Sequence, residues 1–182
     1  MEHEVYNVTS DDYVDFSDLV GIEQLEYGVL QNLNGKEFTD ARNRWDNLRA
    51  IQGLYPTFDL FLVDMYTSLF PRFNCTDIQL DMGKYLEHGP KYRMIQAQRG
   101  QAKTTITAAY AVWRLIHNPA TRVLIFSAGG DMASQIALWV IQIIQGMDVL
   151  EPLRPDIGNR DRIQRASVGA FDVHWALKGP DK

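Results

Sequence analysis

The chain has 182 residues, of which 46% are apolar and 23% charged, and its formal net charge is −5. This length suffices for one domain with a packed core, whereas the apolar runs fall short of the roughly 18 uninterrupted residues of a membrane helix. Cys75 is the only cysteine, which excludes an intrachain disulfide and fits a reducing compartment. The N-terminus lacks the basic-then-apolar pattern of a signal peptide.

Charge is distributed unevenly along the chain. The first 35 residues contain eight acidic side chains and neither Lys nor Arg, whereas the remainder carries 18 basic against 15 acidic side chains. Two interpretations of this turn-rich segment remain open. It is either a solvated, partly disordered acidic arm or a segment that docks on a basic partner surface.

Three helices are predicted before residue 90. Residues 36–53, 57–70 and 76–87 repeat apolar side chains at helical spacing, and Gly or Pro residues separate them. We therefore expect residues 1–55 to form the acidic arm and one helix, and a second region to cover residues 56–182.

The pattern changes after residue 90. Residues 91–97 are typical of a short strand, residues 103–117 of a helix, and residues 122–128, RVLIFSA, of a strand buried on both faces. A helix over 131–145 and a strand over 171–177 follow. This alternation predicts an α/β fold, in which a parallel sheet is flanked by helices and preceded by a helical segment.

The loop AQRGQAKT, residues 97–104, joins the first of these strands to its helix. In a phosphate-binding loop, GxxxxGK[ST], main-chain N–H groups and the helix N-terminus hold phosphate, the lysine reaches the terminal phosphates, and the hydroxyl holds Mg²⁺. Ala97 and Ala102 replace both glycines, and negative φ at both positions would house their methyl groups. Arg99 adds a cation that an anion would use. The alternative is a plain strand-to-helix turn with Arg99 and Lys103 solvated.

The loop, the helix AAYAVWRLIHNP, the strand RVLIFSA and the helix start GGDMASQIA together resemble the ATPase domain of the large terminase subunit of tailed bacteriophages. The resemblance begins at about residue 76, and the family's loop, Arg-Gly-x-[Gly/Ala]-Lys-[Ser/Thr], accommodates Ala102. It implies an ASCE-type P-loop NTPase fold and an ATP hydrolase that drives viral double-stranded DNA into a procapsid. ATP and Mg²⁺ are the implied cofactors.

The resemblance also implies roles for individual residues. Lys103 would contact the β- and γ-phosphates, Arg99 would stabilise charge near the γ-phosphate, and Thr104 would hold Mg²⁺. Lys103 and Arg99 are therefore the expected catalytic residues. Gln79 would present its amide to the adenine edge, or else is an ordinary exposed helix glutamine. The expected ATP-binding residues are Gln98, Arg99, Gly100, Gln101, Ala102, Lys103, Thr104, Thr105 and Gln79.

The implied partners are double-stranded DNA, the portal protein of the procapsid, the small terminase subunit and further copies of the chain in a ring, in the host cytoplasm and without a membrane. The family also carries a Walker B strand that ends in paired acids and a metal-dependent nuclease domain. The nearest match to that strand, LFLVDMY with Asp64, precedes the loop and reads as helical. We therefore expect an incomplete ATPase domain, part of a longer protein that is also an endonuclease.

Four arginines, Arg154, Arg160, Arg162 and Arg165, cluster near the C-terminus. They either form local ion pairs with the interleaved Asp156 and Asp161, or follow DNA phosphates or reach a neighbouring subunit's nucleotide. Two alternative functions also remain open: a helicase-like P-loop ATPase acting on nucleic acid, and a non-catalytic nucleotide-binding assembly protein.

We expect these 182 residues alone to hydrolyse ATP slowly or not at all, because phosphoryl transfer needs charge neutralisation and a positioned water together. The measurement is steady-state phosphate release. Rapid release that depends on Lys103 would contradict this expectation.

Overall fold

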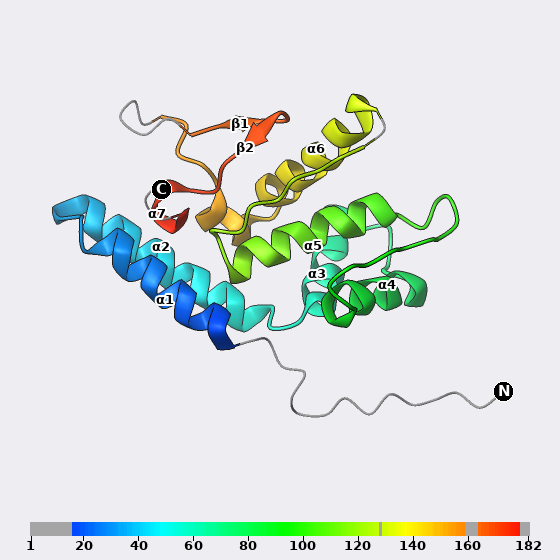
Figure 1. Cartoon of the computed structure of the whole chain (residues 1–182), viewed down its shortest axis with the longest axis horizontal. Helices are drawn as coiled ribbons and strands as arrows, with labels where there is room; N and C mark the ends of the chain where they lie inside the picture. Colours follow the sequence, from blue (N-terminus) through cyan, green and yellow to red (C-terminus); the bar gives the residue numbers. More distant parts are fainter. Residues whose placement is uncertain (1–15, 128, 159–163, 179–182) are drawn as a thin grey trace.

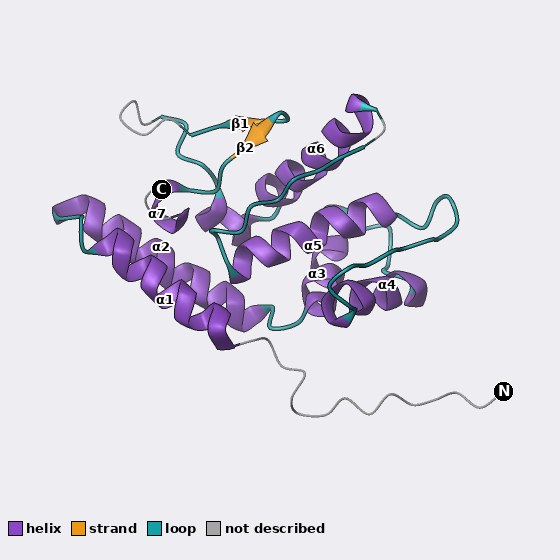
Figure 2. Cartoon of the chain, in the orientation of Figure 1, coloured by secondary structure: helices purple, strands orange, loops and turns teal. Residues whose placement is uncertain are grey.

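The computed structural model describes residues 16–127, 129–158 and 164–178, which are mostly helical (Figure 2). In chain order the elements are α1 (Phe16–Leu30), α2 (Gly35–Leu54), α3 (Phe58–Leu69), α4 (Asp77–His88), α5 (Lys103–His117), α6 (Gly130–Gly146), the 3-10 helix η1 (Asp148–Leu153), the antiparallel strands β1 (Ala166–Ser167) and β2 (Ala170–Phe171), and α7 (Trp175–Lys178).

Helix α5 lies in the middle of the molecule (Figure 1) and packs against α2, α3, α4 and α6. One stripe of its surface is apolar and buried. Each large side chain in such a stripe stabilises the fold by about 1.5–3 kcal/mol when fully removed from water. The helix predicted over residues 103–117 is therefore confirmed. The stripe contains Ile106, Ala109, Val112, Trp113 and Ile116.

The other helices predicted from apolar spacing are also confirmed. Helices α2, α3, α4 and α6 each begin and end one residue from the predicted limits. Asp64 lies within α3, as expected, and accepts a hydrogen bond from the hydroxyl of Tyr55. The described part of the chain contains no helix that is both long and apolar enough to cross a membrane.

Helix α1 occupies residues that we expected to belong to an acidic, turn-rich arm. Its Ile22, Val29 and Leu30 are buried. Glu26 is also buried and forms an ion pair with Arg49 of α2, which offsets the cost of removing its carboxylate from water. The turn-rich interpretation therefore does not hold for residues 16–30. Residues 1–15 lie outside the described residues, and the proposed boundary at residue 56 stays a prediction.

Two segments that we expected to be strands form neither a helix nor a strand. They are residues 91–97 and 122–127. Contrary to the burial expected for RVLIFSA, most of its described side chains are exposed. In Figure 1 both segments run from left to right, opposite to the direction of α5. Because no ladder joins them within the described residues, the parallel sheet and the α/β class stay predictions.

The strand expected over residues 171–177 is wrong. Only Phe171 belongs to a strand, β2, and Trp175–Lys178 form α7. Ala176 and Leu177 are buried where α7 packs on α1 and α2, and the indole Nε1 of Trp45 donates to the carbonyl of Ala176 at 2.8 Å. A tertiary contact to a distant helix therefore decides the conformation of this short apolar run.

The carbonyl of Tyr55, which directly follows α2, connects α2 to α5. Trp113 donates to it through Nε1 at 3.0 Å, and His117 Nε2 lies 3.0 Å from the same oxygen. Since a carbonyl only accepts, His117 Nε2 carries a hydrogen. Burial lowers the pKa of His117 more than the bond to the Tyr55 carbonyl raises it, and the nearby Arg114 also lowers it.

We expect His117 to make stability depend on pH. Its folded pKa is depressed, so the unfolded chain binds a proton more readily, and stability falls as the pH drops below about 6.5. Urea unfolding at about pH 7.5 and about pH 5.5 measures the loss. His117→Gln should lose less stability over this interval than the wild type, whereas the control His88→Gln, at an exposed histidine, should lose as much. Equal losses in all three proteins would contradict this assignment.

Candidate nucleotide-binding loop

The loop before α5 is folded around the ammonium group of Lys103. Lys103 Nζ donates to the carbonyl oxygen of Ala97 at 2.6 Å and to that of Gln98 at 2.9 Å. The N–H of Gln101 lies 3.5 Å from the Gln98 carbonyl oxygen and closes the turn. The lysine, half-buried as the first residue of α5, therefore occupies the centre of the predicted phosphate loop.

The backbone of this loop turns where the phosphate-loop pattern has its second glycine. Ala102 adopts a left-handed conformation, with φ 55° and ψ 27°, and Gly100 has φ 94°. The negative φ that would house a methyl group is therefore found at Ala97 but not at Ala102. A residue with a Cβ atom pays about 1–2 kcal/mol for the left-handed conformation. The chain thus keeps the turn that glycine would adopt, in spite of the alanine.

The N-terminal end of α5 is open to an anion. Ala102 has no side chain that caps the helix, and the first turn contains no acidic residue. By contrast, α2, α3, α4 and α6 each have an acidic residue in the first turn. The first N–H groups of a helix lack intrahelical acceptors, and the helix dipole makes this end positive. Phosphate is the kind of group that such an end binds.

The remaining predicted loop residues lie around this end of α5. Gln98, Arg99 and Gly100 are exposed, whereas Gln101, Thr104 and Thr105 are half-buried. Within the described ranges no ion pair with a carboxylate is found for Arg99, so its guanidinium is available to an anion. The residues predicted to contact phosphate are therefore close together because they follow one another in the loop and the first turn of α5.

Gln79 matches neither of its two interpretations completely. It is only 8% exposed, so it is not an exposed helix glutamine. Its Oε1 accepts from the N–H of Thr76 at 2.9 Å, and its own N–H donates to the hydroxyl of Thr76 at 3.4 Å. These reciprocal bonds form a capping box that begins α4. The contact with adenine stays a prediction.

Local bonds account for the two described members of the arginine cluster. Arg154 donates to the carbonyls of Ile144, Gln145 and Met147 at 2.9–3.1 Å, which closes the C-terminal end of α6. The Arg165 guanidinium bonds to Asp172 at 3.0 Å and holds the pKa of that carboxyl well below its usual range. The interpretation that these arginines form local bonds is therefore supported for Arg154 and Arg165. Among the described residues their partners include main-chain carbonyls and Asp172, and do not include the expected Asp156. Arg160, Asp161 and Arg162 lie outside the described residues.

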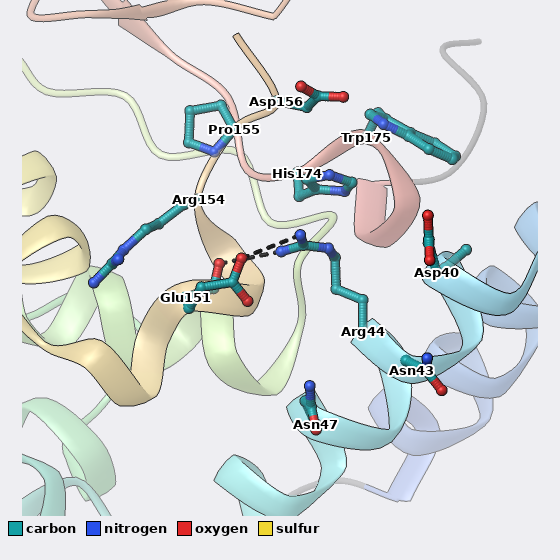
Figure 3. Close-up of a pocket in the computed structure, with 11 residues that line it drawn as sticks. Asp40, Asn43, Arg44, Asn47, Glu151, Arg154, Pro155, Asp156, His174 and Trp175 are labelled. Atoms are coloured by element: carbon teal, nitrogen blue, oxygen red, sulfur yellow. Dashed lines mark hydrogen bonds and ion pairs between the residues drawn. The ribbon is translucent and has the colours of Figure 1, made fainter. Parts of the chain in front are cut away.

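A separate cavity of about 520 Å³ lies between α2 and residues 151–156 (Figure 3), and no sequence motif marked it because its residues come from distant segments. Arg44 donates to the carbonyls of Glu151 and Pro152 at 3.1 and 2.8 Å, and Arg154 points away from Arg44. With both arginines bonded and several carboxylates present, the cavity suits phosphate less than the loop does. Its lining comprises Asp40, Ala41, Asn43, Arg44, Asn47, Glu151, Arg154, Pro155, Asp156, His174 and Trp175.

We expect Ala102→Gly to stabilise the chain by roughly 0.5–1 kcal/mol, because glycine adopts the left-handed conformation without the steric cost and loses only part of this gain to backbone entropy. Chemical denaturation measures the change. The matched control Ala111→Gly, within α5, should destabilise the chain by about 1 kcal/mol. A loss of stability in both variants would contradict the left-handed turn.

No protein-family model matches the chain. Over 99 residues, or 54% of the chain, it is 38% identical to the terminase large subunit of Enterobacteria phage T3, and the matched segment covers 16% of that protein. The chain therefore corresponds to a small part of the length of this relative. The resemblance to the terminase large subunit of tailed phages, predicted from the loop and the elements around it, is confirmed by this match.

Proposed function

We propose that the chain binds Mg²⁺–ATP at residues 97–104 and forms the nucleotide-binding part of a motor that packages viral double-stranded DNA. The observation that carries this proposal is the position of Lys103. Its ammonium lies within a loop that ends in a left-handed residue. The N-terminal end of α5, which follows this loop, has no acidic residue in its first turn and no side-chain cap. The similarity to the phage T3 terminase large subunit supports the DNA-packaging role.

In this proposal the phosphates take the place of the loop carbonyls. The oxygens of Ala97 and Gln98 hold two of the three hydrogens of the ammonium group. A phosphate oxygen is a stronger acceptor than a carbonyl because it is charged, and each such bond contributes about 1.5–3 kcal/mol. The N–H groups at the start of α5 then face the same anion.

Mg²⁺ would be held by the hydroxyl of Thr104 together with phosphate oxygens and water. This fits the ion, since Mg²⁺ keeps several waters and needs few protein ligands beside phosphate. When bound, it would neutralise charge on the β- and γ-phosphates. Arg99, exposed within the loop, would reach the γ-phosphate. We assign nucleotide binding to these residues and leave the acidic groups of hydrolysis unassigned.

The course of the chain supports the proposed P-loop NTPase fold. Segments 91–97 and 122–127 run in one direction in Figure 1, and α5 returns in the opposite direction between them. This is the path of a strand–helix–strand unit of a parallel sheet. For the whole protein, we propose that it hydrolyses ATP and also acts as an endonuclease. We further propose that it forms a ring on the portal of the procapsid in the host cytoplasm, with the small terminase subunit as a partner.

We expect Lys103→Ala to weaken Mg²⁺–ATP binding at least tenfold, about 1.4 kcal/mol, because one charge-assisted bond to phosphate is lost. Isothermal titration calorimetry measures the affinity. Lys84→Ala removes an exposed lysine from α4 and is the matched control that should bind as the wild type does. Unchanged affinity in Lys103→Ala, with thermal unfolding showing an intact fold, would contradict the proposed site.

Thr104→Ala distinguishes the contribution of Mg²⁺ to ATP affinity from that of the phosphate contacts. It should reduce the gain in ATP affinity that Mg²⁺ provides, while leaving binding in the presence of EDTA nearly unchanged, because the hydroxyl contacts the metal and not the phosphate. Titrations with and without Mg²⁺ test this. A variant that retains the full gain from Mg²⁺ would show that Thr104 is not a ligand.

A further inference from the structure

The cavity between α2 and residues 151–156 is a second site, separate from the candidate loop. Its volume of about 520 Å³ lies within the range of about 300–1,000 Å³ that is usual for ligand pockets. In Figure 1 α2 and α7 lie to the left, whereas the loop before α5 lies at the right. One wall of the cavity is a polar stripe of α2, whose side chains recur at helical spacing. The stripe contains Asp40, Asn43, Arg44 and Asn47.

Both arginines of the cavity are already bonded within the chain. Arg44 forms an ion pair with Glu151 at 3.2 Å, in addition to its two bonds to main-chain carbonyls. Arg154 forms an ion pair with Asp148 at 3.5 Å and donates to the carbonyls at the end of α6. These contacts neutralise Glu151 and Asp148. The positive charge of the two arginines is therefore not available to the remaining carboxylates of the lining.

Two carboxylates of the lining keep their negative charge uncompensated. Among the residues that the structure describes, the carboxylates of Asp40 and Asp156 have neither an ion pair nor a hydrogen bond. The main-chain N–H of Asp156 donates to Gln164 at 2.7 Å, which holds this segment in place. Asp40 belongs to α2 and Asp156 to the segment after η1, so the negative charge comes from two different walls. Such a cavity is complementary to a cation.

Trp175 adds an aromatic side chain to the same cavity. It is half-buried and packs on His174, with the ring centroids 5.3 Å apart. In Figure 3 the indole lies between Asp156 and Asp40. The face of an indole attracts a cation, and a guanidinium stacks on it through its plane. The two exposed asparagines of the α2 stripe offer amide oxygens as further acceptors.

We propose that this cavity binds the side chain of an arginine that a partner protein presents. The planar guanidinium has five N–H groups that point in several directions. It can therefore stack on Trp175 and donate to Asp40 and Asp156 at the same time. A lysine ammonium is a compact point charge and lacks the plane that covers the ring. The cavity is larger than one arginine side chain, which leaves room for the main chain that carries it.

A titration of the isotopically labelled full chain with the peptide acetyl-Gly-Arg-Gly-amide, followed by backbone amide shifts, tests the site. The shifts should fall on residues 40–47, 154–156 and 174–175, with residues 97–105 unchanged. The peptide acetyl-Gly-Lys-Gly-amide should bind at least about fivefold more weakly. Since residues 97–105 take no part, the result does not depend on whether the loop binds nucleotide.

The variant Asp40→Asn with Asp156→Asn removes both charges and keeps the size of both side chains. It should bind the arginine peptide at least about tenfold more weakly than the wild type, because two charge-assisted contacts are lost. Asp81→Asn, at an exposed acid of α4, is the matched control and should bind as the wild type does. Thermal unfolding checks that each variant is folded. Raising the ionic strength should weaken binding to the wild type.

Three results would overturn the proposal. The first is the absence of shifts around the cavity at about 10 mM peptide, well above millimolar dissociation constants, or unchanged affinity in the folded double variant. The second is equal affinity for the two peptides, which would exclude recognition of the guanidinium. The third is tighter binding of spermidine than of the arginine peptide, which would identify a free polyamine and not a protein partner as the ligand.

Discussion

The burial of α5 is the interaction on which the rest of the structure depends. Four helices pack against it, and Trp113 contacts the rings of Phe58 and Tyr110 at centroid distances of 5.9 Å. Trp113 and His117 also bond to the carbonyl of Tyr55. A helix held along its length by these contacts has a fixed N-terminal end. The candidate loop is attached to that end, so the core determines where Lys103 and Thr104 lie.

Contacts within the chain hold the loop before α5 in one conformation. Ala102 is in a costly conformation and Lys103 bonds to two carbonyls of its own loop. The lysine thereby maintains the curvature of the loop in the free chain. In the proposed function, phosphate oxygens would replace these two carbonyls as its acceptors, and a loop that is already ordered would lose less conformational entropy on binding. The strain at Ala102 is the local cost of keeping the loop in this form.

The helices could be predicted to within one residue because their apolar stripes are regular, and the loop was located from its Lys-Thr pair. The left-handed Ala102 could not be predicted, since the residue type argues against that conformation. Helix α1 was missed because its acidic residues masked the apolar spacing, and the partner of Glu26 lies on another helix. The run at residues 173–177 is too short to distinguish a strand from a helix by spacing alone.

We propose the N-terminal end of α5 as the anion site of this chain. The most direct test is an NMR titration of the isotopically labelled chain with Mg²⁺–ATP, following backbone amide shifts. We expect the largest changes to fall on residues 99–105, with the amides of α2 around Arg44 unmoved. Changes centred on the cavity between α2 and η1, or none at saturating nucleotide, would contradict it.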